Sequence, residues 1–402
     1  MKLLVFAHTP PPHHGQSYAV KMLLDSFGGD QRKNRHAASP LGIECYHVNA
    51  RFSHGLEDVG EFQGKKIWLI FWYCAQAIWV RFRYGVKIFY YVPAPGKPVA
   101  LYRDWLVMLL CRPFFSKIIF HWHAAGLAKW LETAVSSPTR SLTYRFMKNA
   151  DLSIILSDFN RRDAEKMTAR RIAVVSGGIA DPCPQFEQEM LPRRRARLAA
   201  RQKILTGEIA PNGRDEIVQV LFLAHCIREK GVFDAIEGVA LANAHCVATQ
   251  SPLRFNLTLV GAFADAAEER ELRALLLRPD LQNRVECLGF VSAERKAQAL
   301  AEADLFCFPT FYLAENQPGN LLEALAFGLP IVTTRWRSIP EMLPENYPGL
   351  VAIRAPAQVA DALLRLAGRD DAAALREIFL RKFTLEKNLA GMAAAIRQVA
   401  ED

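Results

Sequence analysis

The stretch that decides the fold is Asp304–Glu341, DLFCFPTFYLAENQPGNLLEALAFGLPIVTTRWRSIPE. An apolar run of strand length ends at Phe308, and the loop after it carries Glu315. The tetrapeptide Gln-Pro-Gly-Asn then opens a helix, with Glu323 one turn inside it. Gly328 closes this helix, because glycine readily adopts the backbone conformation that ends helices, and a second apolar strand follows. The segment therefore predicts a strand, a loop, a helix and a strand.

One carboxylate precedes this helix amino terminus and another follows it. The first turn of a helix has N–H groups without intrahelical acceptors, and the helix dipole adds positive charge there. Such a terminus binds anions, for example the diphosphate of a sugar nucleotide. Two carboxylates eight residues apart can then accept hydrogen bonds from hydroxyl groups at the two ends of that ligand. The predicted donor-binding residues are Glu315, Gln317, Gly319, Asn320, Leu321 and Glu323.

Apolar runs of strand length alternate with helix-length segments on both sides of this stretch. The runs are continuous in their apolarity, which is typical of strands covered on both faces in a parallel sheet. In the second half they are Ile217–His225, Arg254–Gly261, Val285–Phe290 and Leu329–Thr334. In the first half they are Leu3–Ala7, Val86–Val92, Lys117–His123, Leu152–Ser157 and Ile172–Ser176.

The alternation predicts an α/β fold with two Rossmann-like domains facing across a cleft. At 402 residues, the chain is too long for one ordinary core. The pattern stops at Asp181–Asp215, which is rich in proline and contains the basic run RRRAR. We expect an amino-terminal domain at 1–180, a linker at 181–215, a donor domain at 216–382 and a carboxyl-terminal helix at 383–402 that can cross back to the first domain.

Composition bounds the location and the partners. The eight cysteines form no C-x-x-C pair, as expected for reduced thiols of a cytoplasmic protein. The start, MKLLVFAHTPPP, is too short an apolar run for a signal peptide, and the apolar run Ile67–Val80 is too short to span a bilayer. Residues 1–185 contain 24 Lys and Arg against 13 Asp and Glu, a net charge of +11, whereas the remainder has a net charge of −2. The excess suggests an anionic partner, with membrane headgroups or a phosphorylated acceptor ranked before nucleic acid, for which there is no motif.

The segment Ile67–Tyr84 has two interpretations. Its Trp68, Trp72 and Trp79 have near-helical spacing and are followed by Arg81 and Arg83. An interfacial helix would place such aromatic residues among headgroups and the arginines on phosphates. A core helix of the first domain would have a similar sequence.

The segment around Glu315 and Glu323 resembles the family 4 glycosyltransferases of the GT-B fold, whose E-x7-E signature it matches. Four further landmarks extend the resemblance along the chain. They are the loop HTPPPHHGQSYAV, the strand end IIFHWHAAGL, the segment VVSGGI, and the strand-loop-helix LFLAHCIREKGVFDAIEGV with the next strand FNLTLVGAF. The family is retaining, so the resemblance implies transfer of a sugar with retention of anomeric configuration.

The resemblance also implies roles for individual residues. Glu315 matches the glutamate that touches donor-sugar hydroxyls, and Glu323 the one that binds the ribose. Lys230 matches the lysine that grips the donor diphosphate, where an ammonium offsets the charge that grows on a departing diphosphate. The family more often has arginine five positions before this lysine. This chain has His225 there, which leaves the second diphosphate contact open between Arg228 and no charged group.

Two more candidates lie in the first half. His123 matches the active-site histidine of the family, and His121 is the alternative in register. Gly15 resembles the glycine that lets the amino-terminal loop approach the diphosphate, although a glycine needed only for the turn would look the same.

The expected chemistry needs neither metal nor cofactor. The chain contains no D-x-D motif, which the metal-dependent transferases of the other large fold use. Lys230 and the helix amino terminus would take over that role, and the leaving phosphate would help to deprotonate the acceptor, so we assign no protein nucleophile. We expect a UDP-sugar donor and a glycan or lipid-linked acceptor in bacterial surface polysaccharide or lipopolysaccharide synthesis, possible contact with an anionic inner-membrane surface, and no nucleic-acid partner. The alternatives are a sugar-nucleotide epimerase of the same architecture and a non-catalytic nucleotide-sugar-binding relative.

Overall fold

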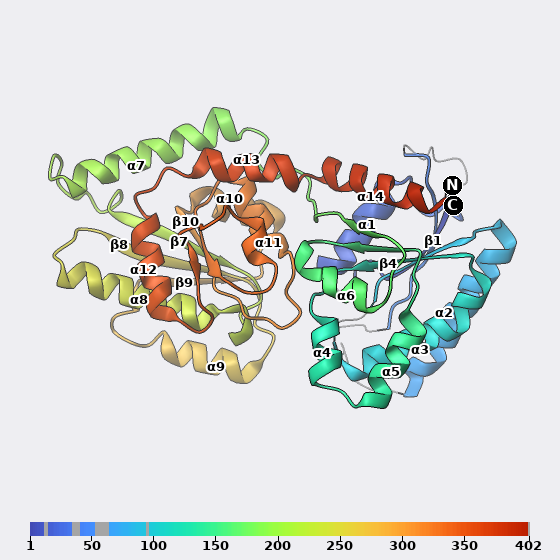
Figure 1. Cartoon of the computed structure of the whole chain (residues 1–402). Coiled ribbons are helices and arrows are strands. Elements are labelled where there is room, and N and C mark those ends of the chain that lie inside the picture. The colour runs from blue at the N-terminus through green and yellow to red at the C-terminus, as the bar shows by residue number, and fades with distance from the viewer. Residues whose placement is uncertain (12–14, 34–40, 53–63, 94–95, 401–402) are drawn as a thin grey trace. The chain divides into compact units, whose positions relative to one another are not determined.

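The computed structural model describes residues 1–11, 15–33, 41–52, 64–93 and 96–400. The chain forms two compact units, drawn in Figure 1. The first comprises Met1–Gly178 and Glu386–Asp402, and the second comprises Ile179–Leu385. Within the described ranges, no helix combines the length and the apolarity needed to cross a bilayer.

The first unit is built on a six-stranded sheet in the order β2-β1-β3-β4-β5-β6, and all neighbouring pairs are parallel. The helices lie between successive strands. The strands are β1 (Lys2–Phe6), β2 (Glu44–Val48), β3 (Ile88–Tyr91), β4 (Lys117–Trp122), β5 (Leu152–Ile155) and β6 (Ile172–Val174). The helices are α1 (Gly15–Ser26), α2 (Gly64–Tyr84), α3 (Pro98–Cys111), α4 (Leu127–Thr133), α5 (Ser137–Met147) and α6 (Arg161–Lys166).

Strand β1 shows why the apolar runs are uninterrupted. Leu4 and Phe6 belong to the hydrophobic core on one face of the sheet, and Leu3 and Val5 belong to the core on the other face. Successive side chains of a strand point to opposite faces, so a strand covered on both sides must be apolar at every position. The prediction of buried parallel strands is confirmed.

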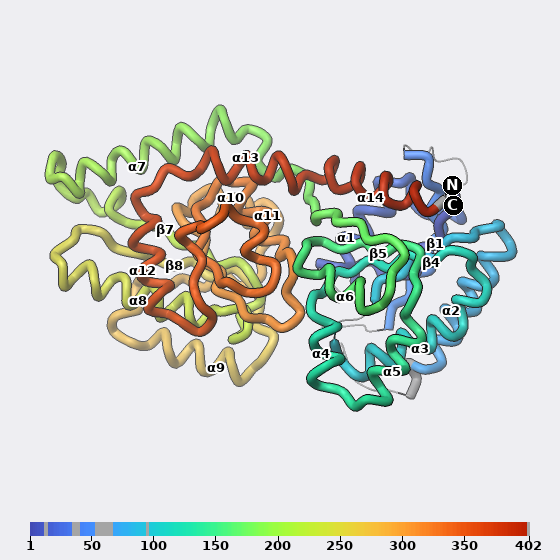
Figure 2. Tube along the Cα trace, viewed as in Figure 1, coloured from blue at the N-terminus to red at the C-terminus, as the bar shows by residue number. Residues whose placement is uncertain are grey.

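The carboxyl-terminal helix α14 (Leu385–Ala400) covers one face of this first sheet. Met392 and Ile396 lie in the same core as Leu3, and Asn388 Nδ2 donates to the carbonyl of Ser176 over 2.7 Å. Helix α1 contributes to the same core, and the trace in Figure 2 shows red α14 and blue α1 on this face. The end of the chain is therefore part of the first unit.

The second unit has its own six-stranded parallel sheet, in the order β12-β11-β10-β7-β8-β9. A single continuous core fills both of its faces. The strands are β7 (Ile217–Leu223), β8 (Arg254–Val260), β9 (Val285–Gly289), β10 (Leu305–Phe308), β11 (Ile331–Thr334) and β12 (Leu350–Val351). The helices are α7 (Leu191–Leu205), α8 (Val232–Ala248), α9 (Ala266–Leu275), α10 (Ala293–Glu302), α11 (Gly319–Ala326), α12 (Pro356–Leu366) and α13 (Ala372–Lys382).

The segment expected to be a linker, residues 181–215, is instead part of the second unit. It contains α7, whose Arg201 is buried and pairs with Asp304 over 3.0 Å. The Arg194 guanidinium is also buried and donates to the carbonyl of Ala303 over 2.8 Å. Arg194 of the basic run, and Arg201 one turn beyond the end of that run, satisfy carbonyls and a carboxylate at the start of β10. The linker interpretation is corrected accordingly.

Candidate functional site

The second sheet reverses its strand order at β7 and β10, which are its central neighbours. From β7 the chain moves outward to β8 and β9, then returns to β10 and continues to β11 and β12. In a parallel sheet, such a reversal leaves a crevice beyond the carboxyl ends of the two strands. The loops after β7 and β10 carry Lys230 and Glu315, so the topology brings these two predicted residues to one place.

A glycine allows the loop after β7 to lie against the end of β10. Gly231 has a φ of +85°, and a Cβ there would lie 2.3 Å from the carbonyl oxygen of Pro309. A larger residue at this position would be strained both by the backbone conformation and by the close approach. The backbone N–H of Phe311 also donates to the carbonyl of Glu229 over 2.8 Å. Lys230, between Glu229 and Gly231, is therefore held beside the loop that carries Glu315.

Lys230 and Glu315 form an ion pair at the centre of the site. The lysine Nζ lies 2.6 Å from Glu315 Oε2, and the Thr310 hydroxyl donates to the same oxygen over 3.3 Å. The ring centroid of Tyr312 is 4.4 Å from Nζ, so the ammonium also contacts an aromatic face. The Glu315 residue is only 7% exposed. The pair presents a cation suited to phosphate and a carboxylate suited to hydroxyl groups, at one point.

Helix α11 begins beside this pair. Pro318 precedes it with an extended backbone, so the first helical residue is Gly319. Gly319 is exposed, and a Cβ there would meet nothing within 4 Å. Gln317 lies in the loop before the proline and is half-buried. The amino terminus of α11 thus has open space beside backbone N–H groups, as an anion site requires.

Asn320 and Leu321 fix the start of α11 on the sheet. Asn320 Nδ2 donates to the carbonyl of Leu223 at the end of β7 over 2.7 Å. Its Oδ1 accepts from the backbone N–H of Leu321 over 2.9 Å, and the Leu321 side chain is fully buried. The structure therefore assigns these two side chains to anchoring the helix. Their contribution to donor binding stays a prediction.

Glu323 has a partner that the sequence motifs do not indicate. Lys296 of α10 donates to Glu323 Oε1 over 2.5 Å. The two residues are 27 positions apart, and no signature connects them. Only the packing of α10 near α11 shows that Lys296 orients the carboxylate predicted to bind the ribose.

Arg228, the candidate for a second diphosphate contact, is paired elsewhere. Its guanidinium lies 2.6 Å from Glu271 of α9 and 4.1 Å from the ring centroid of Phe233. The hydrogen bond from Arg228 to Glu271 raises the pKa of the arginine. His225 follows β7, where burial and then the nearby Lys230 lower the pKa of its imidazole. Near neutral pH, His225 is therefore an uncharged neighbour of Lys230.

The first sheet has its own order reversal, between β1 and β3. Gly15 is the first residue of α1, and a Cβ there would meet nothing within 4 Å. Its φ lies outside the left-handed region, so the turn alone does not demand glycine, and the open space suits the close approach of a ligand. His123 directly follows β4 and is partly exposed, at the same edge of the sheet.

His121 differs from His123 in burial. It lies within β4, is 5% exposed, and its Nδ1 is hydrogen-bonded to the Tyr90 hydroxyl. Its ring centroid is 4.1 Å from that of His123. Burial and then His123 hold the pKa of His121 well below its usual value, so the inner ring is neutral. His123 is the more accessible of the two candidates, as the resemblance implies.

Helix α2 has one buried face and one exposed aromatic face. Ile70, Cys74, Ala77 and Val80 belong to the core of the first unit. On the opposite side, the outward aromatic face consists of Trp68, Trp72, Trp79 and Phe82, which are 78%, 61%, 54% and 68% exposed. The helix therefore packs on the core of the first unit, as the core-helix interpretation expects, while its three tryptophans are exposed.

The described ranges contain no group of three His, Cys, Asp or Glu residues placed to hold a metal ion. Independence from metal stays a prediction, to be tested by activity.

Residues 218–369 match the family model of glycosyl transferases group 1. The predicted resemblance to glycosyltransferases is confirmed. The chain is 28% identical over 188 residues to the amylovoran biosynthesis glycosyltransferase AmsK of Erwinia amylovora, a match that covers 46% of this chain and 44% of that protein. It spans less than half the length of the curated relatives that it matches.

Solved structures match nearly the whole chain. HepE of Anabaena, in complex with UDP and glucose, has a TM-score of 0.64 and 16% identity over 98% of this chain and 99% of that chain. Sucrose-phosphate synthase of Thermosynechococcus elongatus has a TM-score of 0.65 and 17% identity over the full length of both chains. At such identities the likeness shows the fold alone. The two Rossmann-like α/β units are those of the GT-B fold, and that prediction is confirmed.

Proposed function

We propose that the chain is a retaining glycosyltransferase that uses a nucleotide-sugar donor, in the first place a UDP-sugar, in bacterial surface polysaccharide or lipopolysaccharide synthesis. The carrying observation is the contact of Lys230 with Glu315 at the switch point of the second sheet. The group 1 match over residues 218–369 contains both residues. AmsK, named for amylovoran biosynthesis, supports the polysaccharide context, and HepE, solved with UDP and glucose, supports the donor.

The ion pair prepares the site for the two parts of the donor. In the proposed complex, Lys230 turns to the diphosphate, which also lies at the amino terminus of α11. Glu315 then accepts hydrogen bonds from sugar hydroxyls, and Glu323, oriented by Lys296, accepts from the ribose. The donor replaces one internal ion pair by contacts to both partners, so neither buried charge is left unpaired.

The transfer proposed is a same-face substitution. The bond between sugar C1 and the diphosphate oxygen breaks, and the acceptor oxygen forms a bond to C1 on the face that the diphosphate leaves. The acceptor proton passes to the departing phosphate, and the products are a glycoside and a nucleoside diphosphate. Lys230 and the helix dipole stabilise the charge on the leaving group. The family resemblance implies that His123 acts near the donor sugar.

The test is the turnover of Lys230→Ala and Glu315→Gln with a panel of UDP-, GDP- and dTDP-sugars. We expect each change to lower turnover at least tenfold, a loss of about 1.4 kcal/mol of transition-state stabilisation, with the fold intact. Lys203→Ala, on an exposed position of α7, is the matched control and should retain the wild-type rate. Near wild-type rates in both site variants would refute the donor assignment. Free monosaccharide formed without acceptor would indicate the epimerase, and binding without consumption the non-catalytic relative.

We also propose that the acceptor is presented at an anionic membrane, which the outward aromatic face of α2 contacts. At 100° per residue, the four aromatic positions fall within an arc of about 80°. Arg83 projects near this arc, whereas Arg81 Nε donates to the carbonyl of Phe114 over 2.8 Å and is held on the protein. Exposed tryptophans beside a basic group fit the headgroup layer, and residues 1–185 carry the net charge of +11 that attracts anionic lipid.

Co-sedimentation with vesicles tests this contact. Wild type should bind vesicles of phosphatidylglycerol and phosphatidylcholine at low salt, and bind less at high salt or to phosphatidylcholine alone. Trp72→Ser with Trp79→Ser should abolish binding. Phe290→Ser is the control, since Phe290 is an equally exposed aromatic residue of the second unit, at 84%. If wild type ignores anionic vesicles at low salt, the acceptor is soluble, and the donor assignment is unaffected.

A further inference from the structure

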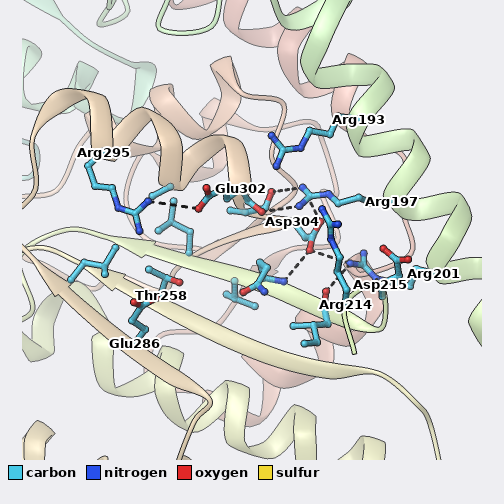
Figure 3. Close-up of a pocket in the computed structure, with 17 residues that line it drawn as sticks. Arg193, Arg197, Arg201, Arg214, Asp215, Thr258, Glu286, Arg295, Glu302 and Asp304 are labelled. Carbon is cyan, nitrogen blue, oxygen red and sulfur yellow. Dashed lines mark hydrogen bonds and ion pairs between the residues drawn. The ribbon is translucent and has the colours of Figure 1, made fainter. Parts of the chain in front are cut away.

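A pocket of about 400 Å³ lies at the amino-terminal edge of the second sheet, shown in Figure 3. Its walls are α7 and α10, and its floor is the sheet at β7, β8 and β9. Asp304, in this pocket, immediately precedes β10, whereas Glu315 follows β10 at the other edge. A four-residue strand, roughly 13 Å long, therefore separates the Asp304 end of the pocket from Glu315.

The α7 wall gathers positive charge around the carboxylate of Asp304. Arg193, Arg197 and Arg201 follow one another at intervals of four residues, so they share one face of the helix. Arg214 joins them from the loop before β7. Arg197 and Arg201 lie 3.1 Å and 3.0 Å from Asp304, each on a different oxygen. Four guanidinium groups thus line this wall with the carboxylates of Asp304 and Asp215 (Figure 3).

These arginines differ in how their donors are used. Arg201 is buried and donates to three backbone carbonyls besides Asp304, so it holds the structure together. Arg197 donates to the carbonyls of Glu302 and Ala303, but its Nε is buried without a hydrogen-bond partner. A buried donor without an acceptor costs free energy, and a ligand oxygen would satisfy it.

Arg193 and Arg214 remain available. Both are exposed, and within the described part of the chain neither guanidinium has an ion pair or hydrogen bond. Burial lowers the pKa of Arg197, and the negative charge of Asp304 raises that pKa. The positive charges of Arg193, Arg201 and Arg214 lower the same pKa further. The wall therefore has four guanidinium groups against the two carboxylates of Asp304 and Asp215, an excess of positive charge.

The remaining surfaces are polar rather than cationic. Gln219 of β7 and Thr258 of β8 are half-buried on the floor. On the α10 wall, Arg295 lies 4.0 Å from Glu302, and Glu286 of β9 adds a second carboxylate. An anionic group is thus favoured at the α7 wall, and hydroxyl or amide groups are favoured over the floor.

We infer that this pocket binds a small phosphorylated molecule, distinct from the donor, whose phosphate lies among Arg193, Arg197 and Arg214. Guanidinium groups match phosphate oxygens in geometry and keep their charge at every physiological pH. The polar remainder of the molecule lies over Gln219 and Thr258. Because the donor site is at the opposite edge of the sheet, both sites can be occupied together.

Titration calorimetry with pyrophosphate at constant ionic strength tests this site in the full chain. Lys230→Ala serves as the background, because it removes the diphosphate grip of the donor site. In that background, pyrophosphate binding should persist, and Arg193→Ala with Arg214→Ala should weaken it at least tenfold. Arg195→Ala is the control, because Arg195 is on the same helix but pairs with Asp370 outside the pocket. Its affinity should stay within twofold of the background.

Two results would overturn the inference. One is an unchanged pyrophosphate affinity in the Arg193/Arg214 variant, and the other is an equal loss in the Arg195 control, which would indicate non-specific charge. Circular dichroism spectra and melting temperatures establish that the variants are folded. In a chain with Lys230 intact, the Arg193/Arg214 variant should still bind UDP as wild type does. Failure of the donor assignment would appear in UDP binding and failure of the new site in pyrophosphate binding.

Discussion

The carboxyl-terminal edges of the two sheets carry different chemistry, although both sheets are parallel and six-stranded. Each sheet reverses its strand order near its centre, and each places candidate residues in the loops beyond. In the second unit, two opposite charges from neighbouring strand ends meet as Lys230 and Glu315. In the first unit, His121 lies within β4 and His123 directly follows that strand; their ring planes are tilted, and the inner ring is neutral.

This difference indicates a division of labour. A preassembled charge pair suits a ligand that has both a diphosphate and hydroxyl groups, since each part replaces one half of the pair. A buried neutral histidine beside a half-buried one suits an uncharged group, such as the sugar or the acceptor hydroxyl. The predictions below test each edge separately, from the largest expected effect to the smallest.

The largest expected loss of stability and turnover follows from a change at Gly231, beside the carboxyl-terminal edge of the second sheet. Gly231→Ala combines a left-handed φ of +85° with a contact of 2.3 Å to the Pro309 carbonyl. We expect the free energy of unfolding to fall by at least about 3 kcal/mol, as for other strained or overpacked positions, and Lys230 to be displaced. Urea unfolding and donor turnover measure both effects.

Gly207→Ala separates the two causes. Gly207 has a similar φ of +75°, but a Cβ there would meet nothing within 4 Å. Only the backbone penalty applies, about 1 kcal/mol, and turnover should be unchanged. Equal losses of stability at the two glycines would contradict the role given to the Pro309 contact.

At the carboxyl-terminal edge of the first sheet, His121 should make the free energy of unfolding depend on pH. His121 has a folded-state pKa well below its usual value, whereas the unfolded chain has a histidine pKa of about 6.5. Below pH 6.5 the unfolded state binds a proton that the folded state does not. The stability tied to neutral His121 is thus present above about pH 6.5 and is lost progressively as the pH falls below that value.

Unfolding of wild type and His121→Gln at pH 7.5 and pH 5 measures this contribution as a difference between the two chains. The variant should lose less stability on acidification than wild type does. His245→Gln, at an exposed histidine of α8, is the control and should follow wild type. A variant as acid-sensitive as wild type would show that His121 is not the group responsible.

The ribose end of the second edge should respond weakly. Lys296→Met keeps the length of the side chain but removes the ion pair with Glu323, in which the lysine is 37% exposed. Because exposed pairs contribute little, we expect the KM for the nucleotide sugar to rise about threefold, roughly 0.6 kcal/mol, with kcat unchanged. A fall in kcat with constant KM would assign Lys296 to the chemical step instead.

The last treatment, removal of divalent metal ions, should leave turnover unchanged. Turnover in excess EDTA should equal turnover without it, because Lys230 and the amino terminus of α11 supply the positive charge for the diphosphate. Complete inhibition that Mn²⁺ or Mg²⁺ reverses would contradict this prediction and the division of labour built on the charge pair.

Much of the architecture was predictable from sequence because buried parallel strands require apolar residues at every position. The runs at β1, β7 and β10 show this, and so does the glycine-closed helix α11. Charged and aromatic segments were predicted less well. Arg194 and Arg201 looked like a solvated linker, and the tryptophans of α2 had two interpretations, because local sequence does not reveal which face of a helix meets a core.

The sequence by itself determined two α/β domains, the spacing of Glu315 and Glu323 around a helix start, and the lysine and glycine after β7. These features are local, and short-range backbone chemistry decides them. Only the tertiary structure decided that Lys230 meets Glu315 across 85 positions, that Lys296 meets Glu323, and that an arginine wall forms beside Asp304. The order of strands in a sheet decides such contacts, and that order depends on the packing of whole domains rather than on any segment within them.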